Sequence, residues 1–378
     1  MSIQSITGLS DARIEELGEE LDAIYEETKA DLGRADEKYI RRMITVQRSM
    51  ALLSRLTIFA SLLFAPWGLF GMRGLYPNMS AFFSVIGVGT FFLAMAKILE
   101  NMEIAHNVMH GQWDWMRDPA IHSGSWEWDN VCPSDQWKHS HNVVHHTWTN
   151  VMGRDRDIGY EIMRVDARQE WHWRFLPQPI YNFLLGLLFE WGVALHDLEL
   201  DEARNGRKTM ADHWPLLKRI GAKAFRQLMK DVVLWPLLAG PFYLLVLGAN
   251  VVANLIRNVW SYMIIFCGHF PEGVHVFEES DLVGETRARW YLRQMLSSCN
   301  ITGGKLFHIM SGNLSHQIEH HLFPDMPSNR YPQVAPRIEA LCARYGIPYN
   351  KGSLTRQFGT TTLKIWRLSL PTPRPALG

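Results

Sequence analysis

Long stretches without a charged residue constrain the fold of this 378-residue chain more than any other feature. Residues 56–72 and 79–96 contain no Asp, Glu, Lys or Arg. Each stretch is close to the ~17–25 residues that cross a bilayer as a helix. The short connection between them carries Gly74 and Pro77, which favour a turn. The sequence therefore predicts a transmembrane helical hairpin.

A second apolar region predicts a second hairpin. Residues 232–249 contain glycine and two prolines, which membrane helices tolerate, and residues 251–268 follow after a short turn near Gly248 and Asn250. Arg257 interrupts the last of these stretches. We therefore expect four transmembrane helices in all.

Basic residues before the first and third stretches indicate the orientation. By the positive-inside rule, both sets lie on the cytoplasmic side, which places both termini and both long polar segments there. These residues are Arg41, Arg42, Arg48, Lys218, Arg219, Lys223, Arg226 and Lys230. Residues 180–195 are also apolar, but they hold Glu190, and a fifth span would separate the polar segments. We predict an interfacial helix there.

These predictions divide the chain into five segments. They are a cytosolic acidic helix (1–48), a first transmembrane hairpin (49–100), a cytosolic segment (101–230), a second hairpin (231–268) and a cytosolic cap with a tail (269–378).

Composition excludes several classes of protein. With 38 basic and 38 acidic residues the formal net charge is zero, so a nucleic-acid partner is not expected. The four cysteines form no CxxC pair, which argues against a zinc ribbon, an iron–sulfur site and a disulfide framework. We expect reduced thiols.

The 16 histidines are clustered in a way that predicts metal binding. Three motifs, HNVMH, HNVVHH and HQIEHH, lie on the side of the predicted spans that we assign to the cytoplasm, and a further histidine ends the fourth span. Histidines four apart on a helix can bind one metal, and the adjacent histidine of an HH pair can reach another. The nine candidate ligands are His106, His110, His141, His145, His146, His269, His316, His320 and His321.

So many imidazoles exceed what one ion binds, since zinc takes about four ligands, so two metals are the simpler interpretation. Imidazole suits zinc, copper, iron and nickel alike. Gln317 leaves open where the third motif starts. Asp155 and Asp157 either orient the histidines through hydrogen bonds or lie in a solvated loop. A tryptophan-rich run, from Trp113 to Trp148, either lines an apolar channel or forms an interfacial belt.

The three motifs, in order and type, resemble the histidine boxes of the membrane-bound fatty acid desaturases, and their flanks resemble the bacterial acyl-CoA branch related to linoleoyl-type enzymes. The resemblance implies an all-α integral membrane fold: four transmembrane helices under a cytosolic helical cap that holds a histidine-ligated di-iron centre. It implies the box histidines as ligands, with His269 as an additional one. In front-end relatives, Gln replaces the first His of the third box.

The resemblance also implies the activity. The expected reaction uses dioxygen and two irons to introduce a cis double bond into a fatty acyl chain, with acyl-CoA favoured over acyl-lipid. Because the chain shows no fused haem motif and no nucleotide-binding motif, a separate ferredoxin, rubredoxin or NADPH-dependent reductase is expected to supply electrons. The alternatives are a di-iron hydroxylase and, from another class, a non-catalytic metal transporter.

Overall fold

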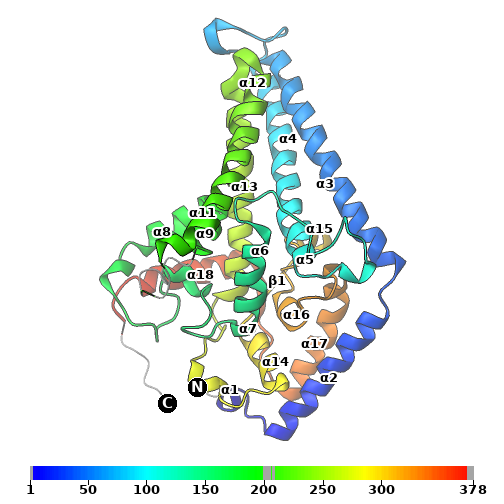
Figure 1. The fold of residues 1–378 in the computed structure, drawn as a ribbon, viewed down its shortest axis with the longest axis vertical. Helices are drawn as coiled ribbons and strands as arrows, with labels where there is room; N and C mark the ends of the chain where they lie inside the picture. Colours follow the sequence, from blue (N-terminus) through cyan, green and yellow to red (C-terminus); the bar gives the residue numbers. More distant parts are fainter. Residues whose placement is uncertain (1–2, 199–205, 207–208, 373–378) are drawn as a thin grey trace.

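The computed structural model describes residues 3–198, 206 and 209–372, and the regular secondary structure within them consists of helices and two short strands (Figure 1). The end of the predicted tail, residues 373–378, lies outside the described residues. Figure 1 shows a wide base from which a narrower stalk of long helices rises. The stalk contains α3 (Arg34–Ser61), α4 (Met79–Ile98), α12 (Trp235–Leu238) and α13 (Tyr243–His269).

The stalk has the surface of a membrane protein. Two helical stretches in the described part of the chain, Met79–Met109 and Gly240–His269, are long and apolar enough to cross a membrane. Large apolar side chains point outward along the stalk, where water would not stabilise them; they include Leu52, Leu53, Leu56, Phe83, Phe91, Leu244 and Val251. An apolar surface of this extent fits lipid.

The first hairpin differs from its predicted boundaries. Helix α3 starts far upstream of the apolar stretch and ends at Ser61, so a helix over all of 56–72 is wrong. A single turn, η1 (Leu62–Phe64), follows, and Ala65 then leaves the helical region with φ −58° and ψ 123°. Pro66 explains this ending, because a proline disfavours helical geometry in the residue before it. The rest of the stretch, with η2 (Leu69–Gly71), connects the two helices.

The second hairpin turns earlier than predicted. The expected turn near Gly248 and Asn250 is wrong, because both residues lie inside α13. The chain rises through α11 (Met210–Leu228), the π-helix η8 (Met229–Leu234) and α12, and it reverses at η9 (Gly240–Phe242). Gly240 adopts a positive φ of 55° and Pro241 has no N–H to donate, which together stop the rising helix.

Buried charges tie the stalk helices together. Asp231 of η8 accepts a hydrogen bond of 2.8 Å from Arg55 of α3 and another of 2.8 Å from Lys97 of α4. Both basic side chains are at least nine-tenths buried, and pairing offsets the cost of removing these charges from water.

Residues 180–195 form two helices instead of the single predicted one. They are α8 (Gln178–Leu187) and α9 (Phe189–His196), with a break at Leu188. Ile180 and Phe183 are more than half exposed, whereas Glu190 is buried and forms an ion pair with Arg257 of α13.

The base encloses the ends of the stalk helices. The acidic N-terminal segment forms α1 (Ile3–Thr7) and α2 (Asp11–Ala30), and α2 packs Ile14, Leu17 and Leu21 against α14 and α17.

Strands β1 (Asn300–Thr302) and β2 (Lys351–Ser353) pair in parallel, a feature absent from the all-α prediction. The other helices are α5 (Asn107–Met109), α6 (Ser134–Trp137), α7 (His146–Trp148), α14 (Arg287–Leu296), α15 (Lys305–Met310), α16 (Gln317–Leu322), α17 (Tyr331–Tyr345), α18 (Leu354–Leu368), η3 (Leu99–His106), η4 (Asp114–Met116), η5 (Lys138–His145), η6 (Ile158–Glu161), η7 (Trp173–Phe175), η10 (Glu279–Leu282) and η11 (Ser328–Arg330).

Asp36 connects the start of α3 to the base through hydrogen bonds. We predict that these bonds contribute to the stability of the fold and that this contribution is lost in acid. Burial opposes its ionisation, but hydrogen bonds from Arg330, Asn329 and the Gly33 N–H outweigh burial and hold the pKa of Asp36 below its usual value. A carboxyl with a lowered folded pKa stabilises the fold above its unfolded pKa, and this contribution is lost as pH falls through the folded pKa.

We therefore expect the thermal midpoint of the detergent-solubilised protein to fall between about pH 5 and about pH 3, and to fall less in Asp36→Asn. Circular dichroism measures both midpoints. An equal fall in the two proteins would contradict this role for Asp36.

Candidate metal centre

One π-helix ends at the first histidine motif, and another carries most of the second. Helix α4 continues into η3, which ends at His106, and η5 carries His141 and His145. In a π-helix, backbone hydrogen bonds run from residue i to i+5, and such segments are frequent at functional sites. The sequence predicts ordinary α-helical spacing at both motifs. The first motif keeps this spacing, because the N–H of His110 donates to the carbonyl oxygen of His106 four positions earlier. The π-helical winding of the second motif is a correction that leaves it on a helix.

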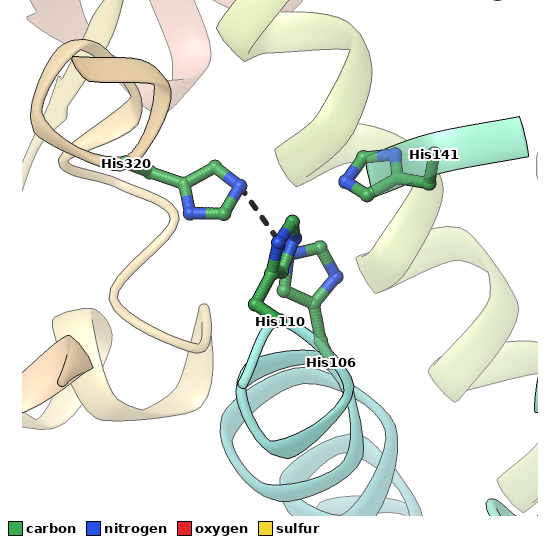
Figure 2. Close-up of side chains that lie close together, drawn as sticks. All are labelled: His106, His110, His141 and His320. Carbon is green, nitrogen blue, oxygen red and sulfur yellow. Dashed lines mark hydrogen bonds between the residues drawn. The ribbon is translucent and has the colours of Figure 1, made fainter. Parts of the chain in front are cut away.

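Four histidines from three separate elements meet at one point (Figure 2). His106 and His110 come from the end of the second stalk helix, His141 from η5 and His320 from α16. One ligand nitrogen of each lies within 4.8 Å of the others. The Nε2 atoms of His106 and His320 are 3.5 Å apart, although 214 positions separate the two residues. We call this set the four-histidine group.

A second set lies next to the first. His145, His269 and His321 also place ligand nitrogens within 4.8 Å of one another, and we call them the three-histidine group. His146 joins His320 and His321 in a further set with the same spacing, so it lies between the two groups. Eight of the nine predicted histidines therefore lie in one continuous cluster.

The cluster has the free nitrogens that a metal requires. Metal–imidazole bonds of ~2.1 Å place two nitrogens on opposite sides of an ion ~4.2 Å apart, so either group needs little movement to close on one. Buried ring nitrogens with no hydrogen-bond partner in the described part of the chain include Nε2 of His110, His141, His145 and His146. Such atoms are costly unless something binds them. The donor set fits a metal-binding function.

Burial keeps most of these imidazoles in the form that binds metal. Desolvation lowers the pKa of His146, His320 and His321 far below the usual value, so each is neutral near pH 7. His145 is different: burial opposes its charge, but Asp155 and Asp157 outweigh burial and raise the pKa of His145 to about 9.

Asp155 and Asp157 both contact predicted ligands. Both carboxylate oxygens of Asp155 lie 3.1 Å from Nδ1 of His145, and Asp155 is buried rather than solvated. It also accepts hydrogen bonds from the backbone N–H groups of Asn150 and Asp157, which fix its position. An oxygen of Asp157 lies 3.8 Å from Nδ1 of His141. These contacts direct the opposite ring nitrogens toward the cluster.

His316 is the one predicted ligand that the structure does not bring to the cluster. It precedes the first residue of α16 and stacks on His308, with ring centroids 4.6 Å apart. The amide nitrogen of Gln317 instead lies 2.9 Å from Nε2 of His269. The sequence spacing assumes a helix that already includes residue 316, whereas α16 begins at Gln317 and therefore turns His316 away.

Other side chains that orient the cluster carry no signal in the sequence. Nδ1 of His321 is 3.0 Å from Oε1 of Gln294 on α14 and 3.2 Å from Oγ1 of Thr149. Nε2 of His196 is 3.1 Å from Asp157. Each lies far from its partner in the sequence, so neither a motif nor a spacing could have identified it.

An apolar pocket opens onto the cluster. Its walls include Trp128 and Trp137, and Trp137 stacks on His141 with ring centroids 4.4 Å apart. The same pocket reaches His106, His145 and His269. Two members of the tryptophan run therefore line this pocket, whereas Trp113 is part of the packed core.

Comparisons with known proteins agree with this site. Residues 81–353 match the model of the family described as Fatty acid desaturase. The chain is 45% identical to the NADPH-dependent stearoyl-CoA 9-desaturase of Mycobacterium tuberculosis over 96% of this chain and 82% of the relative. It is 28% identical to the sn-1 linoleoyl-lipid 6-desaturase of Synechocystis sp. over 71% of this chain and 76% of the relative, and 26% identical to the acyl-lipid (8-3)-desaturase of Mortierella alpina over 56% and 49%.

The chain therefore belongs to the fatty acid desaturase family, as the histidine motifs predict. Its members are oxidoreductases that introduce double bonds into fatty acyl chains, and the apolar stalk agrees with membrane association.

Proposed function

We propose that this enzyme inserts a cis double bond at C9 of a saturated acyl-CoA, with stearoyl-CoA as the first substrate to test. Two observations support the proposal: an apolar pocket runs directly to a buried histidine cluster, and the relative that is 45% identical acts on stearoyl-CoA. A methylene chain needs such a dry, apolar channel beside the reacting centre.

The proposal places two irons in the cluster. The four-histidine group would hold one and the three-histidine group the other, with His146 between them and Gln317 beside His269 in place of His316. Bound there, the irons would supply oxidation by dioxygen: two hydrogens leave the acyl chain, two electrons and two protons enter from outside, and two waters form.

The protein contributes position and exclusion of water. Asp155 and Asp157 hold the rings of His145 and His141 so that their free nitrogens face the cluster. Trp137 packs against His141, and both side chains line the pocket. The acyl chain lies along the same wall, which fixes the methylene groups that face the metals.

The electron donor in this proposal is a separate NADPH-dependent reductase, or a ferredoxin or rubredoxin that a reductase serves. The basic face of α11 is the proposed docking surface. Arg219 and Lys223 pair with Asp135 and Glu127, but Lys218 and Arg226 have no ion-pair partner among the described residues. They remain available to an acidic protein.

The test is the lipid profile of a bacterial host that expresses the enzyme together with a reductase. A new mono-unsaturated acid with its double bond at C9, absent when His145→Ala is expressed, is the expected product. A hydroxy acid would show a hydroxylase instead, and no product at normal iron content would reject the proposed substrate.

The membrane topology in this proposal has four spans, with the histidine cluster and both termini in the cytoplasm. Cysteine labelling tests it, because all four native cysteines are buried and give little background. Tyr76 in the α3–α4 connection is 68% exposed, and Lys351 is exposed in the base.

We expect a membrane-impermeant maleimide to label Tyr76→Cys in intact cells, and to label Lys351→Cys only after the cells are opened. Labelling of both variants in intact cells, or of neither, would contradict four spans with this orientation.

A further inference from the structure

The pocket beside the metal centre has a fixed length along α13. The residues of this helix at every fourth position, Arg257, Ser261, Ile265 and His269, all line the pocket. They form one ridge of side chains, which winds slowly around the helix. With a rise of 1.5 Å per residue, Ser261 lies ~12 Å and Arg257 ~18 Å along the axis from His269.

The ridge leaves the pocket after Arg257. The next position, Ala253, is completely buried and packs with Ile58, Leu93 and Val246 in an apolar cluster of the stalk. That cluster contains no pocket-lining residue. The cavity therefore ends at the level of Arg257.

A layer of polar side chains closes the pocket at this level. Arg257 and Glu190 of α9 form an ion pair in which both side chains are nearly completely buried. Asn101, from η3, accepts a 3.2 Å hydrogen bond from Asn130, and its oxygen is 3.5 Å from Nη1 of Arg257. The backbone N–H of Val131 donates to the second oxygen of Glu190. The layer thus spans the bundle from α13 to η3.

This wall is unfavourable for hydrocarbon. Nε of Arg257 is buried at the wall, and Oγ of Ser261 is buried one helical turn before it. Neither atom has a hydrogen-bond partner among the residues that the structure describes, and both residues line the pocket. A methyl terminus pushed against them would offer no hydrogen bond and would keep water from reaching them, so the polar layer opposes further entry of an acyl chain.

We propose that the Arg257–Glu190 pair is the end wall of the acyl pocket and sets how many carbons fit beyond the new double bond. The inference rests on the proposed function, because it takes the pocket as the acyl site. The α13 ridge is then a ruler with the metal centre at one end and the ion pair at the other.

Two opposite changes test the ruler. Arg257→Leu/Glu190→Leu removes both charges together, so that no unpaired charge stays buried, and it makes room at the far end. We expect it to raise the ratio of product made from arachidoyl-CoA to product made from stearoyl-CoA by about tenfold. Ser261→Leu narrows the pocket nearer the metals, and we expect it to raise the ratio of palmitoyl to stearoyl product by a similar factor.

Arg55→Leu is the matched control. It also replaces a buried arginine of the stalk by leucine, but Arg55 does not line the pocket, and Asp231 keeps Lys97 as its partner. We expect less protein and an unchanged chain-length ratio. Cells expressing each full-length variant with a reductase receive a mixture of saturated acids, and mass spectrometry gives product length and double-bond position.

Opposite shifts with the double bond still at C9 support the ruler. If both pocket variants keep the chain-length ratios of the unaltered enzyme, the proposal is wrong. If the double variant makes no product, an unchanged palmitoyl-to-stearoyl ratio in Ser261→Leu is enough to overturn it. Failure of the proposed function is distinct from these results, because then the unaltered enzyme makes no olefin at any length.

Discussion

His320→Ala is expected to abolish desaturation. His320 belongs to the four-histidine group, and its ring also shares a set of closely spaced ligand nitrogens with His146 and His321, so its loss opens the centre of the cluster. Removing a residue that only orients a metal ligand typically costs about 10–100-fold in affinity or activity. Loss of a ligand itself is therefore expected to cost more than about 100-fold, together with the iron that the four-histidine group would hold.

Product formation by purified enzyme with a reductase, together with iron content by mass spectrometry, measures both effects. His275→Ala is the control, since His275 belongs to none of the histidine groups. It should keep both iron and activity. Normal iron and normal turnover in His320→Ala would mean that the cluster is not the metal centre.

The cluster could be predicted from the sequence because several histidines recur at the same helical spacing, and this pattern is typical of metal ligands. The motifs at His106, His141 and His320 each predict a local pair of ligands. The spacing could not predict the packing that brings α16 to η3 across 214 positions, nor the π-helices that end at His106 and run through His141 and His145.

The buried charges show where sequence reasoning stops. In the sequence, the charge of Arg257 argues against a membrane span, and the charge of Glu190 argues against a span at residues 180–195. In the structure the two side chains form an ion pair, so each charge offsets the cost of burying the other. Hydropathy assigns the cost of burying a charge to each residue separately, whereas the ion pair that offsets this cost joins residues 67 positions apart.

Turns were predicted less well than helices for a related reason. Apolar composition continues through the stretch 56–72 and through α13, so hydropathy alone cannot place the ends of the helices. The backbone decides them: Pro66 ends the first stretch early, and Gly240 with Pro241 moves the second turn upstream.

A second large effect is expected at Gln317. Its amide is 2.9 Å from Nε2 of His269, whereas His316 stacks on His308 outside the cluster. We expect Gln317→Ala to lower turnover by about 10–100-fold, the cost of losing a group that binds or orients at a metal centre. His316→Ala, the neighbouring change, is expected to keep turnover close to that of the unaltered enzyme. Initial rates and iron content of the two purified variants decide between them.

Gly268 offers an independent way to move the same amide. A Cβ at this position would lie 2.9 Å from Cδ of Gln317, so Gly268→Ala must displace the glutamine side chain without removing it. It should therefore resemble Gln317→Ala in activity. If His316→Ala loses activity while Gln317→Ala and Gly268→Ala keep it, then the iron-loaded enzyme extends α16 by one residue and turns His316 inward, and the third motif starts at His316 as its spacing predicts.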